Sequence, residues 1–136
     1  MAVENKSVLS KLFLYIIGYN WIIIPVFLLS QVTILSGALM PLKGKAAAKL
    51  FSGPMPHFLA FFTTTLLVCI ILSNFGIKFY YFLAFIYSMG VATFVEYLQE
   101  YLTSYRTFST TDIMYGAFGA FCLVLLDRVF FLLRKK

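Results

Sequence analysis

The stretch HFLAFFTTTLLVCIILSNFGIKFYYFLAFIYSMGVATFVEYL, His57 to Leu98, decides the fold of this chain. It holds two apolar runs, about His57–Asn74 and Ile77–Leu98, joined through the short segment SNFGIK. A helix needs about 20 mainly apolar residues to cross a membrane, and both runs are close to that length. Because the connection around Gly76 is a tight turn, the two predicted helices are antiparallel neighbours.

Two further apolar runs flank this pair. One covers about Leu12–Ser36, and the other covers about Asp112–Leu133. The long loop between the first and second runs contains Pro and Gly, which argues against one continuous helix. The sequence therefore predicts an all-α polytopic membrane protein, a four-transmembrane-helix bundle that forms a single domain over residues 1–136.

The overall composition agrees with a chain solvated by lipid. Of its 136 residues 62% are hydrophobic and 12% are charged, and the mean hydropathy is +0.92, whereas soluble domains have about 25% charged residues. The net charge of +6 comes from Lys and Arg in loops and tails, which favours membrane topology over nucleic-acid binding. Cys69 and Cys122 lie within apolar runs, which favours packing over disulfide or metal chemistry.

The basic residues predict an orientation. With four spans both termini lie on one side, and seven basic residues share that side against four on the other. Cytoplasmic segments carry the excess of Lys and Arg, so we expect cytoplasmic termini. Adjacent Asp127 and Arg128 are expected to point in different directions and to mark the cytoplasmic end of the fourth helix. The seven are Lys6, Lys11, Lys78, Arg128, Arg134, Lys135 and Lys136, and the four are Lys43, Lys45, Lys49 and Arg106.

The few acidic residues gather at the opposite end of the predicted bundle. Three of the five, Glu96, Glu100 and Asp112, lie within EYLQEYLTSYRTFSTTD. Residues three and four apart share a helix face, so Glu96 and Gln99 project to the same side. An ionised group at the edge of the hydrocarbon is costly without a partner, and Arg106 is the expected partner of Glu96 or Glu100.

Five polar residues are predicted to meet at this rim of the bundle. Ser109 and Asp112 have the spacing of a helix N-terminal cap, and His57 begins the second helix on the same membrane face. The candidate site residues are His57, Glu96, Gln99, Arg106 and Asp112.

Three interpretations of this rim stay open: internal bracing, a ligand-binding rim, and a catalytic or metal site. Zinc sites usually use more His or Cys, and no nucleophile with an adjacent base is visible. We therefore expect no metal, no cofactor and no catalytic residue.

Three glycines are expected to allow close packing of helices. They are Gly90 in the third predicted helix and Gly116 and Gly119 in the fourth. Small residues at helix interfaces in membranes let the backbones approach each other.

At these residues the sequence resembles the VanZ-like family of small bacterial membrane proteins. The resemblance begins at HFLAFF, His57–Phe62, continues with E-x-x-Q at Glu96 and R-T-F-S at Arg106, and ends with Asp112 and Gly119, over about half the chain. The family usually has Asn four residues after the Asp, where this chain has Gly116. That departure puts in doubt any activity that depends on the Asn.

The resemblance implies a multi-pass protein of the bacterial cytoplasmic (inner) membrane and cell envelope. The family's namesake is associated with resistance to the glycopeptide teicoplanin, so the expected contact at the outer rim is a lipid head group, a cell-wall precursor or a glycopeptide. Two alternatives are a non-catalytic accessory subunit that binds other membrane protein subunits, and an intramembrane enzyme that acts on a lipid-linked substrate. We expect a binding protein rather than an enzyme.

Overall fold

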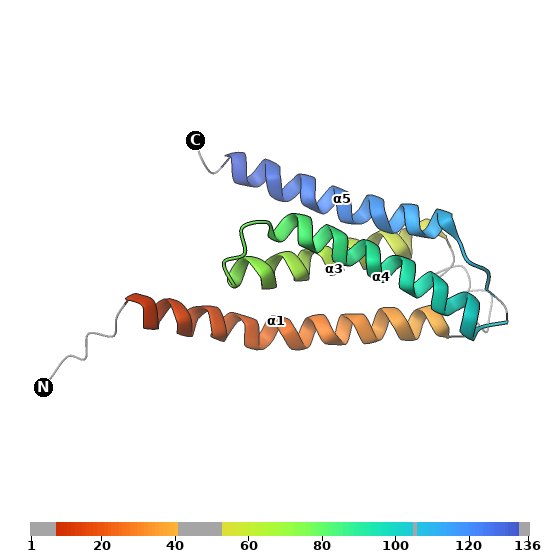
Figure 1. Ribbon diagram of the computed structural model, residues 1–136, viewed down its shortest axis with the longest axis horizontal. Coiled ribbons are helices and arrows are strands. Elements are labelled where there is room, and N and C mark those ends of the chain that lie inside the picture. The colour runs from red at the N-terminus through yellow and green to blue at the C-terminus, as the bar shows by residue number, and fades with distance from the viewer. Residues whose placement is uncertain (1–7, 41–52, 105, 134–136) are drawn as a thin grey trace, which may run out of the picture.

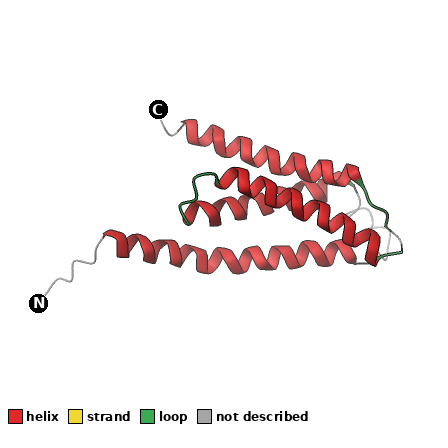
Figure 2. Ribbon diagram, viewed as in Figure 1, coloured by secondary structure: helices red, strands yellow, loops and turns green. Residues whose placement is uncertain are grey.

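The computed structural model describes the backbone of residues 8–40, 53–104 and 106–133, with side chains from Asn20 to Val129 within these ranges. Four helices account for almost all of it, and the described residues contain no strand (Figures 1 and 2). The helices are α1 (Val8–Leu39), α3 (Pro54–Asn74), α4 (Tyr80–Leu102) and α5 (Thr110–Leu133). Seven basic residues lie outside the described residues, namely Lys6, Lys43, Lys45, Lys49, Arg134, Lys135 and Lys136, and of Lys11 only the backbone is described.

The all-helical prediction is confirmed for this part of the chain, and three helices are long and apolar enough to cross a membrane. These are the Asn20–Leu39 segment of α1, α3 and α4, and α5 is not among them. Helix α5 carries Asp112 in its first turn and Asp127 and Arg128 towards its other end. The protein therefore has the helices of an integral membrane protein, and its apolar surface is compatible with contact to membrane lipids.

Helix α3 lies at the centre of the arrangement. It packs against α5, α4 and α1, while α1 and α5 lie on opposite sides of the α3–α4 pair in Figure 1. The core between α3, α4 and α5 is built from small or medium side chains, among them Val68, Cys69, Ala84 and Leu123. The start of α1 and the end of α5 lie at the same end of the bundle.

The turn between α3 and α4 has the geometry expected around Gly76. Gly76 has φ 73°, a left-handed conformation that a residue without Cβ adopts without strain. Its N–H donates to Ser73 O (2.9 Å) and the N–H of Ile77 donates to Leu72 O (3.1 Å). These two bonds close the end of α3 as a Schellman motif. Helix α4 therefore begins at Tyr80 rather than near Ile77, because the residues between them reverse the chain direction.

Hydrogen bonds between side chains link the helices inside the apolar bundle. Asn74 Nδ2 donates to Asn20 Oδ1 across α3 and α1 (3.1 Å), and the hydroxyls of Thr65 and Ser88 bond across α3 and α4 (2.8 Å). Such bonds fix helix register in a membrane, where no water competes for the polar groups.

Gly116 and Gly119 lie where α5 packs closely against α3. A Cβ at Gly119 would collide with the backbone carbonyl of Phe58, and one at Gly116 would lie 2.7 Å from Cδ2 of the Phe61 ring. A backbone atom cannot move aside as a side chain can, so position 119 accepts glycine alone without a shift of the two helices.

The expectation for Gly90 is wrong within the described chain. It lies on an outer face of α4, and a Cβ there would meet no heavy atom within 4 Å. Gly90 therefore brings no described helix close to α4.

We predict that Gly119→Ala lowers the free energy of unfolding by about 1–3 kcal/mol, because the added methyl group overpacks the α3–α5 contact. The measurement is denaturation in mixed micelles followed by circular dichroism. Gly90→Ala is the matched control, and it should leave the stability unchanged or raise it, since Ala favours helix. Equal stability of the two variants would contradict the close approach at Gly119.

Candidate functional site

The buried carboxylate of Glu96 connects the end of α4 to the start of α5. Glu96 is only 2% exposed, and its Oε2 accepts a hydrogen bond from the backbone N–H of Ser109 (3.1 Å). This N–H precedes α5 and has no partner within the helix. One side chain on α4 thus fixes where the next helix begins.

Ser109 caps α5 as its spacing to Asp112 predicts. The Ser109 hydroxyl accepts a hydrogen bond from the N–H of Asp112 (3.2 Å). In a capping box the third helical residue would return a bond to the N–H of the cap. Here Glu96 accepts that N–H, so the carboxylate of Asp112 is left to face His57.

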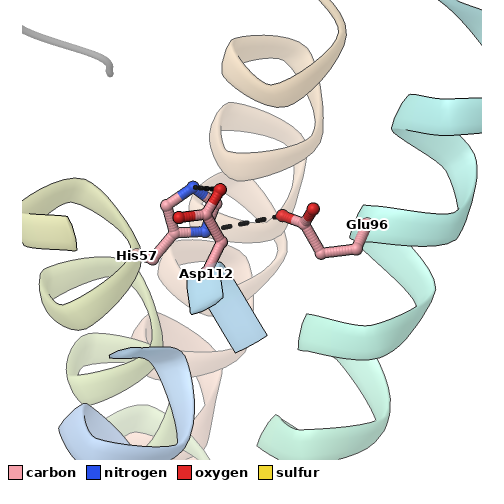
Figure 3. Close-up of side chains that lie close together, drawn as sticks. All are labelled: His57, Glu96 and Asp112. Carbon is pink, nitrogen blue, oxygen red and sulfur yellow. Dashed lines mark ion pairs between the residues drawn. The ribbon is translucent and has the colours of Figure 1, made fainter. Parts of the chain in front are cut away.

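The imidazole of His57 lies between two carboxylates that come from different helices (Figure 3). Its Nδ1 is 3.8 Å from Glu96 Oε1 on α4, and its Nε2 is 3.5 Å from Asp112 Oδ2 on α5. Helix α3 places His57 in its first turn, just after Pro54 and Pro56, which suit a helix start. The two carboxylates can therefore stabilise a positive charge on or beside the His57 ring.

One atom of this group has no hydrogen-bond partner. Glu96 Oε1 is buried, and no described residue donates a hydrogen bond to it. A buried carboxylate oxygen without a donor is costly, because it has lost water and gained nothing equivalent. The position of this oxygen, aimed at His57, makes the group a candidate for a bound proton or cation.

Arg106 does not pair with Glu96 or Glu100, contrary to expectation. No described carboxylate lies within ion-pair distance of its guanidinium. It lines a cavity of about 180 Å³ between α1, α3 and α4 instead, together with His57 and Gln99. The physical reason is that His57 and the N–H of Ser109 already occupy the surroundings of the Glu96 carboxylate.

Most of the remaining wall of this cavity is apolar, and part of the wall, including Thr33, comes from α1. Its polar lining residue Gln99 is held by a bond from Nε2 to the backbone carbonyl of Ala38 (3.1 Å). The contribution of α1 was not predicted, because the sequence does not show that Gly37 and Ala38 line the same cavity as Gln99. The apolar lining residues include Ile34, Gly37, Ala38, Ala60, Phe61 and Val95.

A second polar cluster, which lies at the opposite end of the bundle, was also missed. Asp127 Oδ2 accepts a hydrogen bond from Tyr80 OH (2.8 Å) and pairs with Arg128 (3.3 Å). The guanidinium of Arg128 lies 3.6 Å from the ring centroid of Tyr81. Asp127 and Arg128 therefore do not point apart, because Tyr80 and Tyr81 draw both side chains to α4.

No protein-family model, curated protein or solved structure matches the chain in the comparisons.

We predict that Ser109→Ala lowers the free energy of unfolding by about 1 kcal/mol, because the first turn of α5 loses its side-chain cap. The backbone bond from position 109 to Glu96 remains in this variant. Thr107→Ala, an exposed change in the same loop, is the control and should have little effect. Unfolding in mixed micelles measures both, and an equal loss in the two variants would contradict the cap.

Proposed function

We propose that this chain is a VanZ-like integral membrane protein of the bacterial cell envelope that binds an anionic lipid-type molecule at the outer rim of its bundle. The ligand class is a lipid head group or a lipid-linked cell-wall precursor. Arg106 contacts the anionic group, Gln99 and His57 orient it, and the apolar cavity accepts hydrocarbon.

The main support for this proposal is the position of Arg106 in the wall of the cavity. It lines a mainly apolar cavity beside His57 and Gln99, and it has no described carboxylate partner. A guanidinium binds phosphate through two parallel hydrogen bonds, and a cavity of about 180 Å³ can take part of an acyl or prenyl chain. A charged end beside an apolar wall fits an amphiphile better than a small soluble anion.

The proposal includes four spans in the inner membrane with both termini in the cytoplasm. Helix α5 has 24 residues, which at 1.5 Å per residue extend about 36 Å. It packs along α3 and α4, and its charged residues lie towards its ends, where the membrane meets water. The site would then face outward, where cell-wall precursors are used.

The topology is tested with reporter fusions at each terminus of the full chain. If α5 spans the membrane, a reporter that is active only in the cytoplasm should work at both ends, and one that is active only outside should fail at both. Termini on opposite sides would exclude the fourth span. Both termini outside would exclude the proposed orientation and move the rim to the cytoplasmic face.

We predict that Arg106→Ala reduces the retention of phosphatidylglycerol by the purified full chain about tenfold, the effect expected for the loss of one charge-assisted contact of about 1.4 kcal/mol. Native mass spectrometry of the detergent-extracted protein counts the bound lipids. The zwitterionic phosphatidylcholine should be retained weakly by both proteins. A polyprenyl phosphate, assayed in parallel, shows whether the site prefers the lipid-linked carrier.

Lys78→Ala is the matched control, because Lys78 is an exposed cation in the turn at the other end of the bundle. It should retain phosphatidylglycerol as the unaltered protein does. Equal loss in both variants would mean that net charge alone attracts the lipid, and no loss in Arg106→Ala would overturn the proposal.

A second candidate function is an accessory subunit of a larger membrane complex. The observation that favours it is the exposure of α1, of which only 6% of the apolar span is buried against the other helices, compared with 28% for α3 and for α4. The same mass spectra decide between the two, because a stoichiometric protein partner would appear in the intact particle.

A further inference from the structure

We propose that His57, Glu96 and Asp112 bind one divalent transition-metal ion, with Zn²⁺ as the best fit. This site lies beside the cavity lined by Arg106, and its existence does not depend on the lipid proposal. It also revises the sequence-based expectation that the rim holds no metal.

The three side chains already present their donor atoms to one small volume. One ligand atom from each lies within 4.8 Å of the others. Zinc binds nitrogen and oxygen ligands at about 2.0–2.2 Å, which places neighbouring ligands a little over 3 Å apart. The separations here reach up to 4.8 Å. Glu96 Oε1 faces Nδ1 of His57 and Asp112 Oδ2 faces Nε2, so both carboxylates must move towards the same imidazole nitrogen to complete the site.

The unsatisfied oxygen of Glu96 is the independent observation that indicates a ligand. Glu96 is 2% exposed, its Oε2 is held by the Ser109 N–H, and its buried Oε1 faces His57 without a hydrogen-bond donor. A metal ion would supply the missing partner. The bond to Ser109 would keep the carboxylate oriented, as hydrogen bonds to metal ligands commonly do.

The separations between the imidazole and the two carboxylates are too long for good direct hydrogen bonds, which leaves both acids open to a cation. The two gaps from the imidazole nitrogens to the carboxylates are 3.8 and 3.5 Å, and N–H···O hydrogen bonds span about 2.7–3.2 Å. A protonated His57 would therefore bond poorly to either acid at these distances. A divalent ion bound to the neutral ring would balance both carboxylate charges at once.

The donor set indicates the kind of metal. Imidazole suits zinc and its neighbours, while carboxylates alone would suit Mg²⁺ or Ca²⁺. Three protein ligands with a fourth position left open are characteristic of catalytic rather than structural zinc sites. The two cysteines are not part of this group, since Cys69 lies in the core with Val68 and Ala84.

The test uses the full chain purified in mild detergent with a tag that contains no histidine. After equilibrium dialysis against Zn²⁺, elemental analysis should give one ion per chain. Retention should fall at least tenfold in His57→Ala and in Asp112→Asn. The control Glu100→Gln removes an exposed carboxylate from the same end of α4, and it should retain zinc as the unaltered protein does. Dialysis against Mg²⁺ should give no stoichiometric binding.

X-ray absorption at the zinc edge keeps the proposal testable even where a variant does not fold. For the unaltered protein it should show only nitrogen and oxygen ligands, with the signature of one imidazole. A sulfur ligand would mean that zinc binds to cysteine, and substoichiometric zinc would mean that the His57 group does not hold the ion. Either result, or equal retention in all folded variants, would overturn the site.

Discussion

The hydrogen bond from the Ser109 N–H to the carboxylate of Glu96 is the interaction on which the rim of this bundle depends. Burial of a carboxylate at the edge of a membrane is costly unless each oxygen has a partner. By accepting the N–H of the cap, Glu96 satisfies one oxygen and fixes the start of α5. Because Glu96 accepts the Ser109 N–H, the Asp112 carboxylate does not accept it as it would in a capping box. The Asp112 carboxylate lies near His57 Nε2 instead. The other oxygen, Oε1, has no hydrogen-bond donor among the described residues. The hydrogen bond that fixes the start of α5 therefore satisfies only half of the carboxylate.

The remainder of the bundle holds this arrangement in place through close approach and a few polar links. Gly119, in the third turn of α5, lets that helix approach the backbone of Phe58 near the start of α3, and His57 and Asp112 lie on these two facing helices. The Thr65–Ser88 bond fixes the register of α3 against α4, and register determines whether Glu96 reaches His57. Helix α1 is attached more loosely, through bonds such as that from Gln99 to Ala38 O. A cavity bounded by the most loosely packed helix is where a lipid chain can enter with the least rearrangement.

Hydropathy and turn chemistry were enough to predict the helices from the sequence, and they also located the turn at Gly76 and the cap at Ser109. These features are local, because each depends on residues within one or two turns of each other. The ion-pair and hydrogen-bond partners of the charged side chains could not be predicted in the same way. Arg106 was paired with Glu96 on charge alone, but the competing partners of Glu96 come from α3 and from the backbone at Ser109. For the same reason no metal motif was visible: His57, Glu96 and Asp112 lie on three helices, and only packing brings them together.

Gly116 shows how packing and chemistry compete at this rim. It lies one turn after Asp112 and therefore on the same face of α5, and under the proposed VanZ-like resemblance it corresponds to an Asn. In this chain a Cβ there would meet the ring of Phe61 at 2.7 Å, and Phe61 is buried in the wall of the cavity. An Asn would need the ring to move, and the cavity wall would change with it. Glycine at this position allows close packing against the Phe61 ring, and it gives His57, Glu96 and Asp112 no polar neighbour from this position of α5. Gly116 offers no hydrogen-bond donor for Glu96 Oε1, which is buried without a partner. Any stabilisation of this oxygen must therefore come from another group or from a bound cation.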